Sequence, residues 1–337
     1  MSAYAKGTHD QIGRQVGEEF RRKINNLLRL RRDILLGSVE GISLDDVERV
    51  CRVSVNSVKR YTPTVYTEIN AVAEAANISV GEMMIAGGYT DLIDVLGKVT
   101  HPLDGECTVI SRTDDRAIFG TWDSHVTAKD SLILLERHLS CGLKTLALST
   151  AGWPAQQGIN NCGIAFAITN LTPKTSNPSG LNYIAANAYI ADCRNIFQFL
   201  HFAKHTPFQS GHSFILSDSK GNGFVVETSA SGISKRKTIS CDCQTNHYID
   251  IRLDNNSNYS FMDGSKNRRF EAQTSLSSST DAYKFKKALK LSQYINKSDP
   301  NSLAYTCGHF YLSTTQNKVW YSGGPATEDD MLCMTLE

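Results

Sequence analysis

The chain has no hydrophobic run long enough to cross a membrane and no excess of charge of either sign. No segment approaches the ~18 apolar residues of a membrane-spanning helix, and the N-terminus turns polar by His9 without the apolar centre of a signal peptide. With 35 basic and 34 acidic residues, the net charge of +1 creates no field that favours nucleic acid or an anionic membrane. We therefore expect a globular cytoplasmic protein that binds neither.

The sequence also lacks the cysteine spacing of a disulfide framework or a metal site. The nine cysteines are odd in number and irregularly spread, which is typical of a reducing compartment. Cys241 and Cys243 lie near His247, but they lack the C-x2-C spacing of a metal site and no second ligand pair follows. We predict no metal and no cofactor, and we interpret the two thiols as small side chains on one face of a strand.

The first hundred residues have the pattern of helices. Apolar residues at three- and four-residue steps predict an amphipathic helix over about residues 9–36, and Pro63 suits the first position of another that runs to about residue 76. Capping boxes, in which a side chain binds the free amides of a first helical turn, are predicted at Thr8, Ser43 and Ser79.

The remaining residues have the pattern of short strands joined by turns, which favours antiparallel sheets. Helices are predicted over 182–202 and about 268–295, the latter broken at 275–280. The order of helices and strands predicts an α+β layered fold rather than a doubly wound parallel sheet. The strands are predicted over residues 108–111, 117–122, 145–149, 163–169, 213–218, 224–227 and 306–313.

Cys107 lies where the helical leader meets the first strand, in Asp104-Gly105-Glu106-Cys107-Thr108. If the Glu106–Cys107 bond is cut, the freed α-amine, with an ordinary pKa near 7.7–8.0, can accept the proton of its own thiol. Two other interpretations stay open: a buried structural cysteine, or a papain-like thiol enzyme in which His125 or His247 is the base.

Several short segments across nearly the whole chain match one family in order and in approximate spacing. They resemble the acyl-coenzyme A:6-aminopenicillanic acid acyltransferase-like family of N-terminal nucleophile hydrolases. The segments are Gly7–Gly17, Cys107-Thr108, Trp122-Asp123, Gly211-His212-Ser213, Gln244–Tyr248, Ser265–Arg269 and Val319–Pro325.

This resemblance implies a four-layer αββα sandwich made from one precursor that cuts itself before Cys107. The products would be a helical α chain of residues 1–106 and a catalytic β chain of residues 107–337, which associate as one folded unit. Relatives commonly have glycine immediately before the cysteine, whereas this chain has Glu106 after Gly105. That departure puts the efficiency of the cut in doubt.

The resemblance also implies roles for individual residues. Cys107 matches the nucleophile, Asp123 matches the acid that holds the α-amine, and Asn246 matches the amide that stabilises the oxyanion. Thr108 and Ser265 match residues near the nucleophile.

The family also has an arginine near the nucleophile, which Arg268 or Arg269 would supply. A guanidinium there could lower the thiol pKa or bind a substrate carboxylate, and the sequence leaves open which of the two points inward. The loop over 170–180 and leader residues such as Tyr89 and Leu92 are candidates for shaping the pocket.

Together these features predict an amidohydrolase acting on a small linear amide, either an N-acyl or an aminoacyl conjugate. One alternative is an acyltransferase that moves an acyl group from coenzyme A or an amide donor to an amine. Another is an uncut, catalytically idle binding protein, which Glu106 favours. The acyl group, the acceptor and the oligomeric state are left open.

Overall fold

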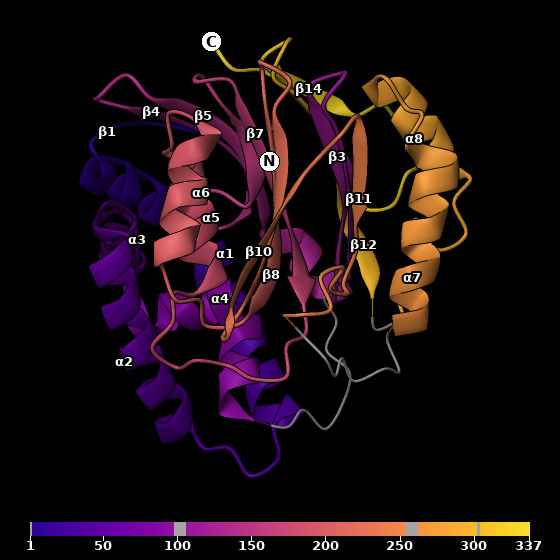
Figure 1. Ribbon diagram of the computed structural model, residues 1–337. Helices are drawn as coiled ribbons and strands as arrows, with labels where there is room; N and C mark the ends of the chain where they lie inside the picture. The colour runs from indigo at the N-terminus through magenta and orange to yellow at the C-terminus, as the bar shows by residue number, and fades with distance from the viewer. Residues whose placement is uncertain (1, 98–105, 254–261, 302–303) are drawn as a thin grey trace.

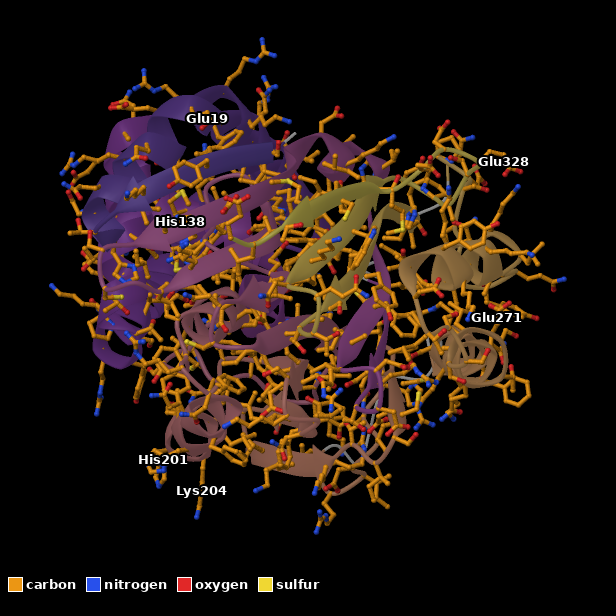
Figure 2. All side chains as sticks on the ribbon, turned by 90° about the horizontal axis from the view of Figure 1, so that it is seen from above. Glu19, His138, His201, Lys204, Glu271 and Glu328 are labelled. Carbon is orange, nitrogen blue, oxygen red and sulfur yellow. The ribbon has the colours of Figure 1, made fainter. Side chains whose placement is uncertain are left out.

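The computed structural model describes residues 2–97, 106–253, 262–301 and 304–337, and it forms four layers (Figure 1). Two β-sheets face each other, with the leader helices and two later helices outside one sheet and α7 and α8 outside the other. This arrangement is the predicted αββα sandwich. Figure 2 shows charged side chains such as Glu19, Lys204 and Glu328 pointing outward at the periphery.

Each sheet combines strands from distant parts of the described chain. The first sheet has the order β1 (Ser2–Gly7), β4 (Leu132–Leu139), β5 (Lys144–Thr150), β6 (Gln157–Asn160), β7 (Ile164–Leu171), β8 (Gly211–Asp218), β9 (Gly223–Ser229) and β10 (Gly232–Lys237). The second has the order β11 (Cys241–Gln244), β2 (Cys107–Arg112), β3 (Ala117–Ser124), β12 (Tyr305–Ser313), β13 (Lys318–Gly323) and β14 (Leu332–Thr335).

The leader forms four helices, and their predicted starts are confirmed. The side chains of Thr8, Ser43 and Ser79 each make a complete capping box, and Pro63 opens α3. The side chains of α1 fill the space against α3 and the first sheet because its apolar residues recur on one face. The bounds are α1 (His9–Ser38), α2 (Leu44–Tyr61), α3 (Pro63–Ala76) and α4 (Val80–Leu96).

Three apolar clusters lie between the four layers. The largest joins the leader helices to the first sheet, the second lies between the sheets around residues such as Leu134 and Phe310, and the third joins the second sheet to α8 through Phe285. Within the described ranges, no helix is both long and apolar enough to cross a membrane.

All seven predicted strands are confirmed, but the later helices differ from the prediction. The segment 182–202 contains two helices, α5 (Tyr183–Ala191) and α6 (Ile196–His205), because Asn195 caps a new helix by accepting from the Gln198 amide. The last helical region begins earlier than predicted, as α7 (Met262–Glu271), and continues through a π-helical turn, Ala272–Leu276, to α8 (Ala282–Lys290).

The expectation of antiparallel pairing fails at one edge of the first sheet. β1 pairs with β4 in parallel, with Ser2 opposite Leu134, whereas the other named strand pairs are antiparallel. Parallel neighbours require a long crossover, and here the crossover contains the whole helical leader.

A buried ion pair ties the leader to the first sheet. The Glu68 carboxylate on α3 accepts from Nε of Arg137 on β4 at 2.8 Å and pairs with Nδ1 of His9 at 2.7 Å. Arg137 is fully buried and Glu68 is 1% exposed. Breaking one partner of such a pair leaves the other as an uncompensated charge.

Glu68→Ala should therefore lower the free energy of unfolding by about 3 kcal/mol, because it removes the closer of the two carboxylates of the buried Arg137 guanidinium and leaves Asp192 at 3.3 Å. Urea unfolding at neutral pH measures this change. Glu74→Ala is a matched control on the same helix, because Glu74 is exposed and should change stability by less than about 0.5 kcal/mol. Equal effects of the two substitutions would contradict this account.

Candidate active site

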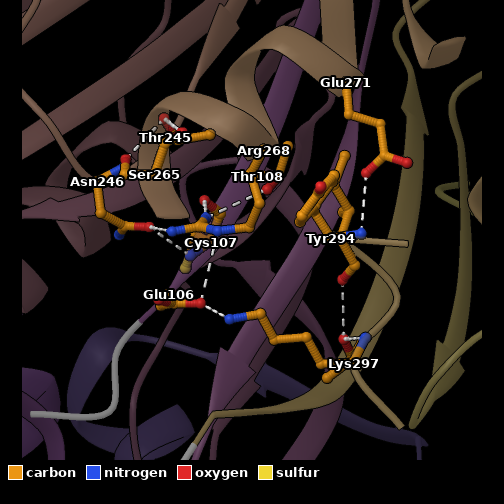
Figure 3. Close-up of polar contacts among 12 residues, drawn as sticks. Glu106, Cys107, Thr108, Thr245, Asn246, Ser265, Arg268, Glu271, Tyr294 and Lys297 are labelled. Carbon is orange, nitrogen blue, oxygen red and sulfur yellow. Dashed lines mark hydrogen bonds and ion pairs between the residues drawn. The ribbon is translucent and has the colours of Figure 1, made fainter. Parts of the chain in front are cut away.

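Cys107 begins β2 in a buried position and is held through its backbone (Figure 3). Its N–H donates to Oδ1 of Asn246 at 2.9 Å, and its carbonyl oxygen accepts from Nη1 of Arg268 at 2.8 Å. The same Arg268 donates from Nη2 to Oδ1 of Asn246 at 2.9 Å. The structure thus brings together three residues that are far apart in the sequence.

The side chain of Asn246 is fixed at both ends. Oδ1 accepts from Cys107 and Arg268, while Nδ2 donates to the carbonyl oxygen of Asn170, at the end of β7, at 2.9 Å. Its backbone N–H donates to Oγ of Ser265 on α7 at 2.8 Å. The acceptor end of this amide therefore faces the backbone of Cys107, and its donor end faces Asn170.

The two arginines of α7 have different contacts, which settles which one points inward. Arg268 is 2% exposed and also reaches Oγ1 of Thr108 at 3.4 Å. Nε of Arg269 donates to the carbonyl oxygen of Cys243 at 3.0 Å and so holds the end of β11. Consecutive helical residues point about 100° apart, so only one of them can reach Cys107.

Asp123, near the end of β3, is a buried carboxylate without a hydrogen-bond partner among the described residues. Its exposed fraction is 0%, and neither side-chain oxygen has a partner. Burial raises the pKa of this carboxyl to about 7, although the charge of Arg268 and the hydroxyls of Thr306 and Thr121 oppose the rise. Its backbone N–H donates to the carbonyl oxygen of Glu106 at 2.8 Å. The carboxylate therefore lies beside the Glu106–Cys107 bond, and the charge of Arg268 offsets only part of the cost of burying it.

The thiol of Cys107 is not activated in this state. Burial and the charge of Asp123 together raise its pKa to about 12, although the backbone N–H groups of Asp123 and Asn170 and the charge of Arg268 act in the opposite direction. A thiol with such a pKa is protonated at neutral pH, so attack requires a nearby base.

The carboxylate of Glu106 is held by two cations. Its Oε2 forms an ion pair with Nζ of Lys297 and lies 3.5 Å from Nε of Arg268 (Figure 3). These contacts fix the side chain that precedes Cys107. Asp104 and Gly105 lie outside the described residues.

The two histidines of the papain-like alternative have no contact with Cys107 in the described structure. Nδ1 of His247 bonds to Oγ of Ser265 at 2.8 Å, and burial lowers the pKa of His247 to about 4. His125 bonds to the hydroxyl of Thr127 at 2.6 Å. The geometry gives neither ring access to the sulfur.

A cavity of about 40 Å³ lies next to Cys107 and Asp123. Tyr89 of the leader and Asn170 line it as expected, whereas Leu92 is buried in the core. Sequence reasoning missed other lining residues, namely Arg31, Thr90, Trp122, Ser124, Gln156, Gln157, Ile168, Tyr183 and His212. Arg31 carried a signal, because it follows Leu28 by three positions and precedes Leu35 by four on the buried stripe of α1.

The sequence matches the model of a protein family. The model described as acyl-coenzyme A:6-aminopenicillanic acid acyl-transferase matches residues 110–306, which is more than half of the chain. The chain belongs to this family. The match begins just after Cys107 and contains Asp123, Asn246, Ser265 and Arg268. The acyltransferase family is named for an enzyme that transfers acyl groups.

Solved structures similar to this acyltransferase-family chain include a hydrolase and an acylase. A mutant conjugated bile acid hydrolase from Clostridium perfringens is 11% identical, with a TM-score of 0.45, over 68% of this chain and 92% of that one. Penicillin V acylase from Agrobacterium tumefaciens is 12% identical, with a TM-score of 0.43, over 68% of this chain and 86% of that one. A comparison with curated proteins finds no match.

The orphaned carboxylate predicts a pH-dependent effect of Asp123→Asn in an uncut chain. In the Cys107→Ala background, which lacks the attacking thiol, the substitution should stabilise the protein more at pH 8 than at pH 4. The unfolded carboxyl loses its proton near 3.8 and the folded one near 7, so the destabilisation grows between these values and then stays constant. The difference should reach up to about 4 kcal/mol.

Urea unfolding at the two pH values measures this difference. Asp263→Asn, at an exposed position of α7, is the matched control and should not reproduce it. A stabilisation by Asp123→Asn that is the same at both pH values would show that the carboxylate is not buried unpaired.

Proposed function

We propose that this protein is a cysteine amidohydrolase that cuts itself before Cys107 and then cleaves a small linear amide, an N-acyl or aminoacyl conjugate. The observation that carries the proposal is the arrangement around the Glu106–Cys107 bond. The carbonyl oxygen of Glu106 accepts from the Asp123 N–H, the N–H of Cys107 donates to Asn246, and the Asp123 carboxylate beside them has no partner among the described residues. A cut would supply that partner as the α-ammonium of Cys107.

The cut follows from these contacts. Sγ of Cys107 attacks the carbonyl carbon of Glu106, and the Asp123 N–H stabilises the oxyanion that forms. The peptide C–N bond then breaks, the thiol proton passes to the departing α-amine, and a thioester joins Glu106 to Sγ. Water hydrolyses the thioester, which leaves a carboxylate on Glu106 and a free thiol beside a free amine on Cys107.

Turnover uses the same groups on an external amide. The α-amine takes the thiol proton, because its ordinary pKa of about 7.7–8.0 leaves part of it neutral near pH 7, and Asp123 orients it. The thiolate attacks the substrate carbonyl, the side-chain amide of Asn246 donates to the oxyanion, and the α-ammonium protonates the leaving amine. Water then releases the acid from Sγ. Arg268 and Ser265 hold Asn246 in place, so their role is positioning.

Two alternatives have a specific observation in their favour. The name of the matching family favours acyl transfer, in which an amine replaces water as the group that takes the acyl chain from Sγ. The ion pairs of Glu106 favour an uncut binding protein, because they fix the residue whose carbonyl must be attacked. Acyl transfer would give an acylated amine when an amine acceptor is added to the assay, whereas hydrolysis gives the free acid. An uncut binding protein would be purified as one full-length chain.

Cys107→Ala should abolish both the cut and amide turnover, because one sulfur performs both attacks. A denaturing gel should show a single band of 37.2 kDa for this variant and two smaller bands for the unmodified protein. Cys141→Ala, at an exposed free cysteine, is the matched control and should be cut normally. Amidase activity retained by Cys107→Ala would refute the assignment.

Asn246→Ala should leave the protein folded and reduce the turnover number by on the order of 10²–10³, the usual effect of removing one oxyanion donor. Steady-state kinetics of the cut form, with circular dichroism to check folding, measure this effect. Asn267→Ala, at an exposed position on α7, should leave the rate unchanged. If Asn246→Ala turns over substrate at the normal rate, Asn246 has no oxyanion role.

A further inference from the structure

Arg31 on α1 is a buried guanidinium without a carboxylate partner among the residues that the structure describes. It is 2% exposed and lines the cavity next to Cys107. Nη1 donates to the carbonyl oxygens of Ala86 and Gly87, the latter at 3.3 Å, and the guanidinium lies 4.5 Å from the ring centre of Tyr89. These contacts satisfy one nitrogen and leave the positive charge uncompensated. Burying an isolated charge is costly unless a partner arrives.

The rest of the cavity wall supplies no second cation. Burial lowers the pKa of His212 to about 3, so its ring is neutral. Its Nδ1 lies 3.5 Å from Oδ1 of Asp91, a carboxyl whose pKa burial raises well above its usual range. Asp123 has Arg268 as its neighbouring cation and, under the proposed function, the α-ammonium as its partner. Among the described residues that line this cavity, Arg31 is therefore the cation without a carboxylate partner.

Neutral polar groups beside Arg31 also lack partners within the described ranges. Oγ1 of Thr90 and Oε1 of Gln156 and Gln157 are buried without a hydrogen bond, and all three residues line the cavity. The Arg31 guanidinium and the Thr90 hydroxyl can donate to a small anion, whereas the two amide oxygens can only accept. At about 40 Å³, the cavity is far below the roughly 300–1,000 Å³ of typical ligand pockets, so it suits a short group.

We infer that the protein cleaves amides whose acyl part is a short dicarboxylic acid, with the free carboxylate of that acid bound by Arg31. The inference rests on the proposed function, because it requires Cys107 to be the nucleophile that opens onto this cavity. The acyl part remains bonded to Sγ while the amine departs, so the enclosed space next to the sulfur holds the acyl side. Arg31 is then a specificity-determining residue supplied by the leader.

The binding test uses succinate and butanoate, which differ in the second carboxylate. Each is tested for protection of Cys107 from alkylation by iodoacetamide, followed by mass spectrometry of the cut protein. A charge-assisted contact to Arg31 should make succinate protect at concentrations about 10- to 100-fold lower than butanoate. Arg31→Met should abolish the difference. Arg32→Met, at the adjacent residue that pairs with Glu82, should retain it.

The turnover test compares N-succinyl-4-nitroanilide with N-butanoyl-4-nitroanilide. The unmodified protein should cleave the first with a kcat/KM about 10- to 100-fold higher, mainly through KM, and Arg31→Met should reduce the ratio to about one. If Arg31→Met fails to fold, the protection and turnover comparisons on the unmodified protein still show whether the site prefers a second carboxylate.

The outcomes separate the inference from the proposed function. Equal protection by succinate and butanoate, together with equal cleavage of the two anilides, would overturn the carboxylate site and leave the amidohydrolase intact. A chain that stays uncut and cleaves neither anilide would overturn both. Preference for succinate in both tests, lost in Arg31→Met and kept in Arg32→Met, supports the inference.

Discussion

The proposed chemistry depends on the burial of the Asp123 carboxylate beside the bond between Glu106 and Cys107. A carboxylate that is 0% exposed and without a hydrogen-bond partner among the described residues costs free energy, and its pKa near 7 expresses that cost. A positive charge at the nitrogen of Cys107 would remove the cost. The uncut chain is therefore a strained arrangement that a cut would relieve, and under the proposed function the same carboxylate then orients the base used in turnover.

The layered fold makes this arrangement by bringing strand ends to one place. β2 begins at Cys107, β3 ends just after Asp123, and β11 ends just before Asn246, while α7 covers them and inserts Arg268. The first sheet contributes Asn170 from β7. The leader forms part of the wall of the cavity next to Cys107, because α1 and α4 supply residues that line it. The buried contact of Glu68 with Arg137 holds the leader on the first sheet. Cutting the backbone would thus leave these contacts in place.

The sequence predicted the helical leader and the strands because both follow from local patterns, whereas the four-layer sandwich and the roles of the site residues were implied by the family resemblance. Capping boxes gave the starts of three leader helices, and short motifs placed Cys107, Asp123 and Asn246 at strand ends. It missed what depends on distant partners. β1 is a short strand whose partner β4 lies more than a hundred residues away, and Arg268 could be chosen over Arg269 only from the direction of α7.

Arg31 shows the same limit at the cavity. An arginine in a run of basic residues on an amphipathic helix ordinarily faces water. Its burial depends on Tyr89 and on the carbonyl groups of α4, which no local pattern reveals. Its place on the apolar stripe of α1 indicated that Arg31 is buried. That it faces the cavity next to Cys107 could be seen only in the packed structure.

Intact mass spectrometry of the purified, catalytically active protein tests the central claim most directly. This account predicts two chains, residues 1–106 and residues 107–337, with an unmodified cysteine at the start of the second. A single uninterrupted chain that turns over amides at full rate would contradict it, because Cys107 would then have no terminal amine to act as its base.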